Sequence, residues 1–115
     1  MVNHFSIGAD AAQLDRVFGA LGDPTRRAIL LRLAAEPGLS VSDLARPLPI
    51  SLPAVTKHLT VLEAAGLLAR QKSGRVVACR LEAAPMREAM AWLAHYQRFW
   101  GESLDRLAAL VEEQP

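Results

Sequence analysis

The chain has 115 residues, the size of one ordinary domain, so we expect a single hydrophobic core. Hydrophobic residues make up 51% of the chain and charged residues 22%, a balance typical of folded rather than disordered proteins. The longest apolar stretches are short and interrupted by charge, and the N-terminus lacks a signal-peptide pattern, so we expect a cytoplasmic protein without membrane association.

The positive charge is concentrated in the middle of the chain. The net charge is only +1, but residues 51–80 carry five basic side chains and a single acidic one. Residues 81–115 carry six acidic and three basic side chains. A local excess of cations is one mark of a nucleic-acid-binding surface.

Residues 1–9 show no hydrophobic periodicity, so we expect a flexible tail followed by one domain at 10–115. Asp10 has the spacing of a helix cap, and the first helix ends at Gly22. The apolar stripe of this helix consists of Leu14, Val17, Phe18 and Leu21.

The pair Asp23-Pro24 predicts the start of a second helix, which runs to about residue 36. Either Ser40 or Ser42 is placed to cap a short third helix, which the prolines at 47 and 49 prevent from continuing.

Ser51 is placed to cap a fourth helix spanning 51–65, and Gly66 is well placed for a left-handed helix end. Extended runs at 68–72 and 76–81, joined by Ser73-Gly74, predict a β-hairpin.

Pro85 opens a last helix that reaches about residue 113 and would extend past most of the core. This helix carries a cluster of aromatic side chains, Trp92, Tyr96, Phe99 and Trp100. These rings need an apolar surface to pack against, and we favour a partner subunit as its source, with a ligand pocket as the alternative.

The predicted fold is mainly α with a small β-hairpin, in the order α-α-α-α-β-β-α. The third and fourth helices, joined by a tight connection at 47–50, form a helix-turn-helix, and the hairpin makes it a winged one.

The helix at 51–65 has an outward face of small and hydrogen-bonding side chains, which suits close approach to base edges. An amphipathic core helix whose polar face meets only water looks the same in isolation, but the basic hairpin that follows favours DNA binding. Ser51 and the free amides near it are placed to hold a phosphate. The predicted DNA contacts are Ser51, Pro53, Ala54, Thr56, Lys57, His58, Thr60, Arg70, Lys72 and Arg75.

Several runs of the sequence resemble the ArsR-type family of bacterial winged-helix repressors. They are Leu-Gly-Asp-Pro-Thr-Arg-Arg-Ala-Ile-Leu at 21–30, Ser-Leu-Pro-Ala-Val-Thr-Lys-His-Leu at 51–59 and Leu-Glu-Ala-Ala-Gly-Leu-Leu at 62–68. The resemblance implies a homodimer, formed by the first and last helices, that represses transcription from a partly palindromic operator on double-stranded DNA. The interface residues assigned on this basis are Leu14, Val17, Phe18, Trp92, Tyr96, Phe99, Trp100, Leu104 and Leu107.

The sequence departs from the metal-sensing members of that family, which carry a Cys-x-Cys pair where this chain has Ser40-Val41-Ser42. Serine hydroxyls are poor ligands for soft metals, and His95 has no second histidine nearby, so we predict no metal and no cofactor. The sequence leaves the release signal open between a small molecule, a partner protein, oxidation of Cys79 and self-regulation alone. Cys79 is predicted to be a buried, inert thiol, with a redox switch as the alternative.

The sequence predicts a DNA-binding transcriptional regulator, with a winged-helix protein-interaction module that lacks DNA binding as the alternative. It contains no paired carboxylates, nucleophile triad or phosphate-binding glycine loop, so we do not expect an enzyme.

Overall fold

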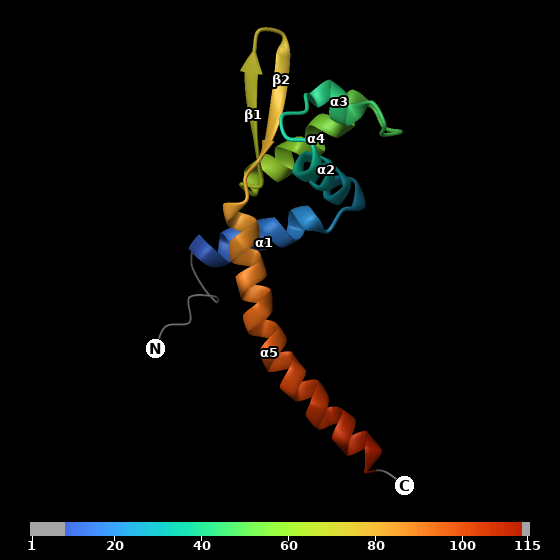
Figure 1. Cartoon of the computed structure of the whole chain (residues 1–115), viewed down its shortest axis with the longest axis vertical. Coiled ribbons are helices and arrows are strands. Elements are labelled where there is room, and N and C mark those ends of the chain that lie inside the picture. Colours follow the sequence, from blue (N-terminus) through green and yellow to red (C-terminus); the bar gives the residue numbers. More distant parts are fainter. Residues whose placement is uncertain (1–8, 114–115) are drawn as a thin grey trace.

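The computed structural model describes residues 9–113, and Figure 1 shows a helical body with a hairpin at one end and a long helix leaving the other. The order of elements confirms the predicted α-α-α-α-β-β-α arrangement. The elements are α1 (Ala9–Leu21), α2 (Pro24–Ala35), α3 (Val41–Ala45), α4 (Leu52–Ala64), β1 (Leu68–Ser73), β2 (Val76–Leu81) and α5 (Ala84–Glu112).

The start of α1 differs from the prediction. The helix begins at Ala9, so Asp10 lies inside its first turn and the predicted cap at Asp10 is wrong. Ala9, Ala11 and Ala12 surround Asp10, and the high helix propensity of alanine extends the helix beyond it. The remainder of the tail expected at 1–9 falls outside the described residues.

Side-chain oxygens cap the next helices as predicted. The carboxylate of Asp23 accepts the N–H of Arg26 at 3.1 Å, and the hydroxyl of Ser51 accepts the N–H of Ala54 at 3.3 Å. At α3 the cap is Ser40, because Ser40 and Asp43 each accept the other's backbone N–H in a capping box. Each cap satisfies an amide that the helix itself leaves without a partner.

Gly66 ends α4 in the left-handed conformation, with a φ of +76°. Its N–H donates to the carbonyl of Glu63 at 2.9 Å, and the N–H of Leu67 donates to that of Leu62 at 3.0 Å. This pair of bonds is a Schellman motif, which turns the chain back so that Leu67 enters the core.

The core lies where the first turns of α5, together with α1, α2, α3 and α4, meet the base of the hairpin. The segment before α3 also pairs with β2, because the N–H of Cys79 donates to the carbonyl of Leu39 at 2.8 Å and Ser40 bridges to Ala78. This pairing fixes the hairpin relative to the helices. The buried core residues are Val17, Ala20, Ile29, Leu30, Leu33, Leu44, Val55, Leu59, Leu62, Ala65, Leu67, Leu68, Cys79 and Ala89.

The hairpin of β1 and β2, called the wing below, turns one residue later than predicted. Ser73 pairs with Val76, so the turn consists of Gly74 and Arg75 and not of Ser73 and Gly74. Gly74 has a φ of +62° and Arg75 does not have a positive φ, the pattern of a type II′ turn, which matches the twist of paired strands. Arg75 therefore lies at the tip itself.

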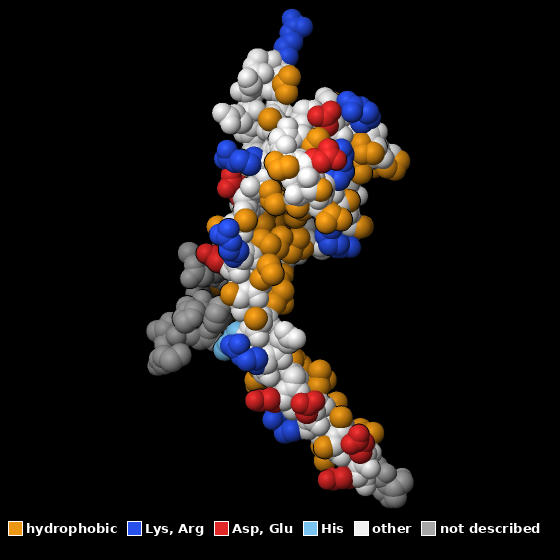
Figure 2. All heavy atoms as spheres, in the orientation of Figure 1, with side chains coloured by type: hydrophobic (Ala, Val, Ile, Leu, Met, Phe, Trp, Pro, Cys, Tyr) orange, Lys and Arg blue, Asp and Glu red, His pale blue; other side chains and the backbone are white. Residues whose placement is uncertain are grey.

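The helix α5 makes the molecule elongated. The radius of gyration is 18.7 Å, whereas a compact chain of this length has one of about 13 Å. Among the described residues of α5, Ala89 alone is buried, and the side chains beyond Trp92 that were predicted to form a dimer interface are exposed. Figure 2 shows apolar side chains along one side of this projecting part. No helix in the described range 9–113 is long and apolar enough to cross a membrane.

The side chains that α1 was expected to give to the dimer interface have different surroundings. Val17 is 1% exposed in the core of its own chain, so its assignment to the interface is wrong. Leu14 and Phe18 are half-buried, and the ring of Phe18 meets that of Trp92 edge to face at 5.8 Å. Helical periodicity identified the apolar face of α1 but could not distinguish a contact with the chain's own core from one with a partner.

Replacing Gly66 with Ala should lower the free energy of unfolding by about 1–2 kcal/mol, because an L side chain is strained at this φ. The added Cβ would also lie 3.1 Å from Nε2 of Gln13 and 3.2 Å from Cγ of Pro85. Urea denaturation followed by circular dichroism, at one protein concentration, measures the loss. Gly74→Ala is the control, since its φ is also positive but its Cβ meets nothing within 4 Å. Equal losses would show that crowding at Gly66 has no effect.

Candidate nucleic-acid interface

The helix α4 buries one face completely and exposes the other. Val55, Leu59 and Leu62 are each 0% exposed and form the inward face of the helix. The residues predicted to face outward are all exposed. They are Pro53, Thr56, Lys57 and Thr60.

The first turn of α4 has fewer available amides than expected for holding a phosphate. Pro53 has no N–H, and the N–H groups of Ala54 and Val55 already donate to the hydroxyl and the carbonyl of Ser51. Leu52 therefore supplies the remaining amide of this turn. Ser51 is exposed and Ala54 is half-buried, so Ser51 presents the more accessible side chain.

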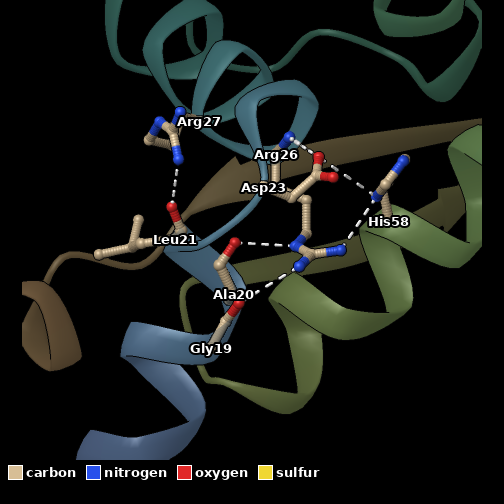
Figure 3. Close-up of polar contacts among 7 residues, drawn as sticks. All are labelled: Gly19, Ala20, Leu21, Asp23, Arg26, Arg27 and His58. Atoms are coloured by element: carbon tan, nitrogen blue, oxygen red, sulfur yellow. Dashed lines mark hydrogen bonds and ion pairs between the residues drawn. The ribbon is translucent and has the colours of Figure 1, made fainter.

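His58 lies on the flank of α4 and points toward the junction of α1 and α2 (Figure 3). Its side chain is 22% exposed, so it is less accessible than the side chains on the outward face of the helix. Nδ1 of His58 is 3.2 Å from Nη1 of Arg26 and 3.9 Å from Oδ2 of Asp23. This contact joins α4 to the start of α2.

Asp23 is held in its charged form at this junction. The N–H of Arg26 donates to its carboxylate and is the main reason that the pKa of Asp23 lies below its ordinary value. The nearby guanidinium of Arg26 lowers the pKa further, and desolvation opposes these effects but is smaller than the effect of the hydrogen bond. The cap of α2 is therefore an anion at neutral pH.

Arg70 does not extend freely from the wing. Its Nη2 is 2.7 Å from Oε1 of Glu63 and also donates to the hydroxyl of Thr60 at 3.3 Å, and both partners are on α4. The hydrogen bond from Arg70 lowers the pKa of Glu63 and, in return, raises the pKa of Arg70. Arg70 thus fastens the base of the wing to α4.

The tip of the wing carries the accessible cations. Lys72 and Arg75 are exposed, and within the described residues no carboxylate pairs with either of them. Arg80, on the opposite strand, is paired with Glu82 at 2.8 Å. The charge of the wing is therefore available mainly at its tip, where Figure 2 shows a cation projecting at the end of the hairpin.

Cys79, on strand β2 of the wing, is fully buried, in agreement with the predicted position of an inward-facing thiol. Burial raises the pKa of this thiol, so its reactive thiolate form is disfavoured at neutral pH. These surroundings favour the inert thiol over the redox switch.

Comparison with known proteins identifies the family. A family described as a helix-turn-helix domain matches residues 21–71. The HTH-type transcriptional regulator Rv2034 of Mycobacterium tuberculosis is 40% identical over 100 residues, covering 87% of this chain and 90% of the relative. The crystal structure of an ArsR family transcriptional regulator matches with a TM-score of 0.74 at 43% identity, covering 79% of this chain and 93% of that chain. This chain belongs to the ArsR family.

These matches confirm the resemblance seen in the sequence. This member of the ArsR family is a DNA-binding transcriptional regulator with a winged helix-turn-helix fold. An ArsR-like transcriptional regulator from Rhodococcus sp. RHA1 has the same fold, with a TM-score of 0.73 at 35% identity. The match covers 90% of this chain and 94% of that one. The structure that positions α4 and the wing is therefore shared across nearly the whole domain.

Arg26 is a residue of this ArsR-family site that sequence reasoning missed. The Asp23-Pro24 signal identified the helix start, and Arg26 follows the cap by three residues. No pattern in the sequence connects Arg26 with His58, which lies 32 residues further along the chain. The contact depends on how α4 crosses α2, which only the structure gives.

Replacing Glu63 with Gln should lower the free energy of unfolding at pH 7 by up to about 1 kcal/mol, because an ion pair with this exposure stabilises only modestly. The folded-state pKa of Glu63 lies below its ordinary value of 4.5, so this stabilisation is present above pH 4.5 and is lost as the pH falls through the folded-state pKa.

Urea denaturation of the wild type and of Glu63→Gln at pH 7 and well below pH 4.5 checks the dependence. The difference should disappear in acid, and a difference that stays constant would contradict the ion pair. Glu88→Gln, at an exposed position on α5, is the matched control and should have little effect at either pH.

Proposed function

We propose that this ArsR-family regulator represses transcription by placing α4 in the major groove of double-stranded DNA while the wing follows the neighbouring backbone or minor groove. The exposed cations of α4 and the wing tip support this proposal, because Lys57, Lys72 and Arg75 are all accessible. Small side chains and hydroxyls around Lys57 permit a close approach to base edges.

We assign the DNA contacts according to how each side chain is held. Thr56 and Lys57 are placed for base edges, and Lys72 and Arg75 for phosphates. Thr60 donates to the carbonyl of Thr56 at 3.0 Å, so its hydroxyl is partly committed within α4. Because Arg70 is paired with Glu63, we assign Arg70 to holding the wing rather than to contacting DNA. Ser51, Pro53, Ala54 and His58 remain proposed contacts at the start and flank of the helix.

We further propose that a second copy of the chain covers the apolar face of α5. Trp100, Leu104 and Leu107 are 44%, 55% and 57% exposed, which is costly for side chains of this size in water. Helical stripes of this kind are usually packing surfaces, and a two-fold pair uses the same face on both subunits. Leu14, Phe18 and Trp92 lie at the inner end of this face, where α1 crosses α5.

A two-fold pair explains how a single recognition helix per chain becomes specific for one DNA site. Paired helices enter successive major grooves about 34 Å apart, so the operator should be partly palindromic. Binding of this kind blocks a promoter directly. The transcriptional repressor SdpR of Bacillus subtilis, 28% identical over 83 residues, supports repression as the outcome.

The family is one of transcriptional regulators and not a class of enzymes, and we propose no catalytic role for this chain. Its place of action is the cytoplasm, where bacterial DNA is accessible. A protein-interaction module without DNA binding is the second candidate, and the exposed cations favour DNA over it. Gel shifts with the DNA upstream of its own gene test the proposal, and the absence of salt-sensitive binding to any duplex would favour the second candidate.

Replacing Lys72 or Arg75 with Ala should weaken DNA binding and reduce the slope of log K against log salt by about one unit for each phosphate that the variant no longer neutralises. Fluorescence anisotropy with labelled duplex at several salt concentrations measures the slope. Arg98→Ala removes the same charge from the exposed surface of α5 and should leave the slope unchanged. A wild-type slope in both test variants would contradict the proposed phosphate contacts of Lys72 and Arg75.

Replacing Trp100 with Asp should convert the dimer to a monomer, because a buried unpaired carboxylate would replace an apolar anchor. Size-exclusion chromatography with light scattering measures the mass, and operator affinity should fall by at least about tenfold since a monomer occupies a single half-site. Arg98→Asp adds a carboxylate on the opposite side of α5 and should remain dimeric. If Trp100→Asp stays dimeric, the proposed interface is wrong.

A further inference from the structure

Arg26 links the end of α1, the start of α2 and the flank of α4 (Figure 3). Its Nε donates to the carbonyl of Ala20 at 2.8 Å, and its Nη2 donates to the carbonyl of Gly19 at 3.2 Å. Its Nη1 is 3.2 Å from Nδ1 of His58. The guanidinium is therefore held by backbone atoms on one side while its remaining nitrogen faces the imidazole.

The chemistry of this contact determines which ring nitrogen carries hydrogen. A guanidinium has donors only and keeps its charge, so Nδ1 of His58 must be the acceptor in the contact with Arg26. A neutral imidazole with a free lone pair on Nδ1 carries its hydrogen on Nε2. The geometry therefore gives His58 one donor, Nε2–H.

The contact between His58 and Asp23 requires the opposite state. To donate to Oδ2 of Asp23, Nδ1 would need a hydrogen of its own, and it could then no longer accept from Arg26. The distance to Asp23 is 3.9 Å, beyond a normal hydrogen bond, whereas the distance to Arg26 is 3.2 Å. The shorter contact therefore decides the tautomer.

The donor nitrogen points out of this cluster. In Figure 3 the second ring nitrogen of His58 is directed away from both Asp23 and Arg26. His58 is next to the exposed Lys57 on α4, and its own side chain is partly accessible. A short donor on the flank of the helix, rather than at the centre of its outward face, suits a phosphate oxygen better than a base edge.

We propose that Arg26 is a positioning residue of the DNA interface: it holds His58 as the Nε2–H tautomer, and His58 donates that hydrogen to a phosphate oxygen of the bound duplex. This inference rests on the proposed function, because it requires α4 to lie against DNA. It assigns to Arg26 a role exerted through His58 and not through direct contact with DNA.

A matched pair of variants separates the two nitrogens of His58. In His58→Asn the amide oxygen replaces Nδ1 as acceptor for Arg26, but the outer donor is removed. In His58→Gln the amide nitrogen replaces the outer donor, but the inner acceptor is removed. Anisotropy should show roughly tenfold weaker DNA binding for His58→Asn, the effect of one hydrogen bond to a charged group, with operator and unrelated duplex affected equally. His58→Gln should bind more tightly than His58→Asn.

Arg26→Met, which cannot donate, and Arg26→Lys, which can, test the positioning role. Arg26→Met should weaken DNA binding about as much as His58→Asn does. The double variant Arg26→Met/His58→Asn should bind DNA no more weakly than either single variant. Arg26→Lys should restore part of the affinity. Circular dichroism checks that each variant is folded. In the wild type at neutral pH, ¹⁵N NMR of the histidine rings should show Nδ1 of His58 without hydrogen and Nε2 with it, and Arg26→Met should add hydrogen at Nδ1.

The outcomes distinguish this inference from the proposed function. If the wild type binds no duplex in a salt-dependent way, the proposed function fails. If the wild type binds but His58→Asn binds equally well, the donor role of His58 is wrong and the proposed function stands. A loss of affinity confined to the operator would show a base contact in place of the phosphate, and additive losses in the double variant would overturn the action of Arg26 through His58.

Discussion

The orientation of the outward side chains of α4 depends on complete burial of the opposite face of this helix. Val55, Leu59 and Leu62 are fully buried, and each contributes on the order of 1.5–3 kcal/mol relative to an exposed side chain. Because these positions follow the helical period, burying them forces Thr56, Lys57 and Thr60 to the outside. The same contacts that stabilise the domain therefore orient the surface that we propose to contact DNA.

Local features of this fold could be predicted from the sequence, because their causes lie within a few residues. The caps at Asp23 and Ser51 and the left-handed end at Gly66 each depend on a few residue types at one position, whereas at the third helix the sequence left Ser40 and Ser42 as alternatives. The hairpin turn was misplaced by one residue because Ser73-Gly74 and Gly74-Arg75 are both acceptable turn sequences, and the register that decides between them is set by pairing along the strands.

Contacts between distant segments could not be predicted in this way. Val17 has the spacing of an interface residue and of a core residue equally, and only the crossing of the helices shows that it belongs to the core. The pairing of Arg70 with Glu63 follows from how the wing returns to α4, and the contact of Arg26 with His58 from how α2 crosses α4. Charge counts could not distinguish cations that build the interface from cations that remain available.

This distinction changes how the basic middle of the chain is understood. Residues 51–80 carry five basic side chains, but Arg70 and Arg80 are each paired with a carboxylate, and the pair of Arg70 with Glu63 links the wing to α4. Lys57, Lys72 and Arg75 remain exposed, on the outward face of one helix and at the tip of the wing. The contact of Arg70 with α4 fastens the base of the wing to this helix, so the regulator presents its available charge in a defined geometry instead of as a diffuse basic surface. A fixed geometry favours recognition of one DNA shape, whereas diffuse charge would bind any duplex.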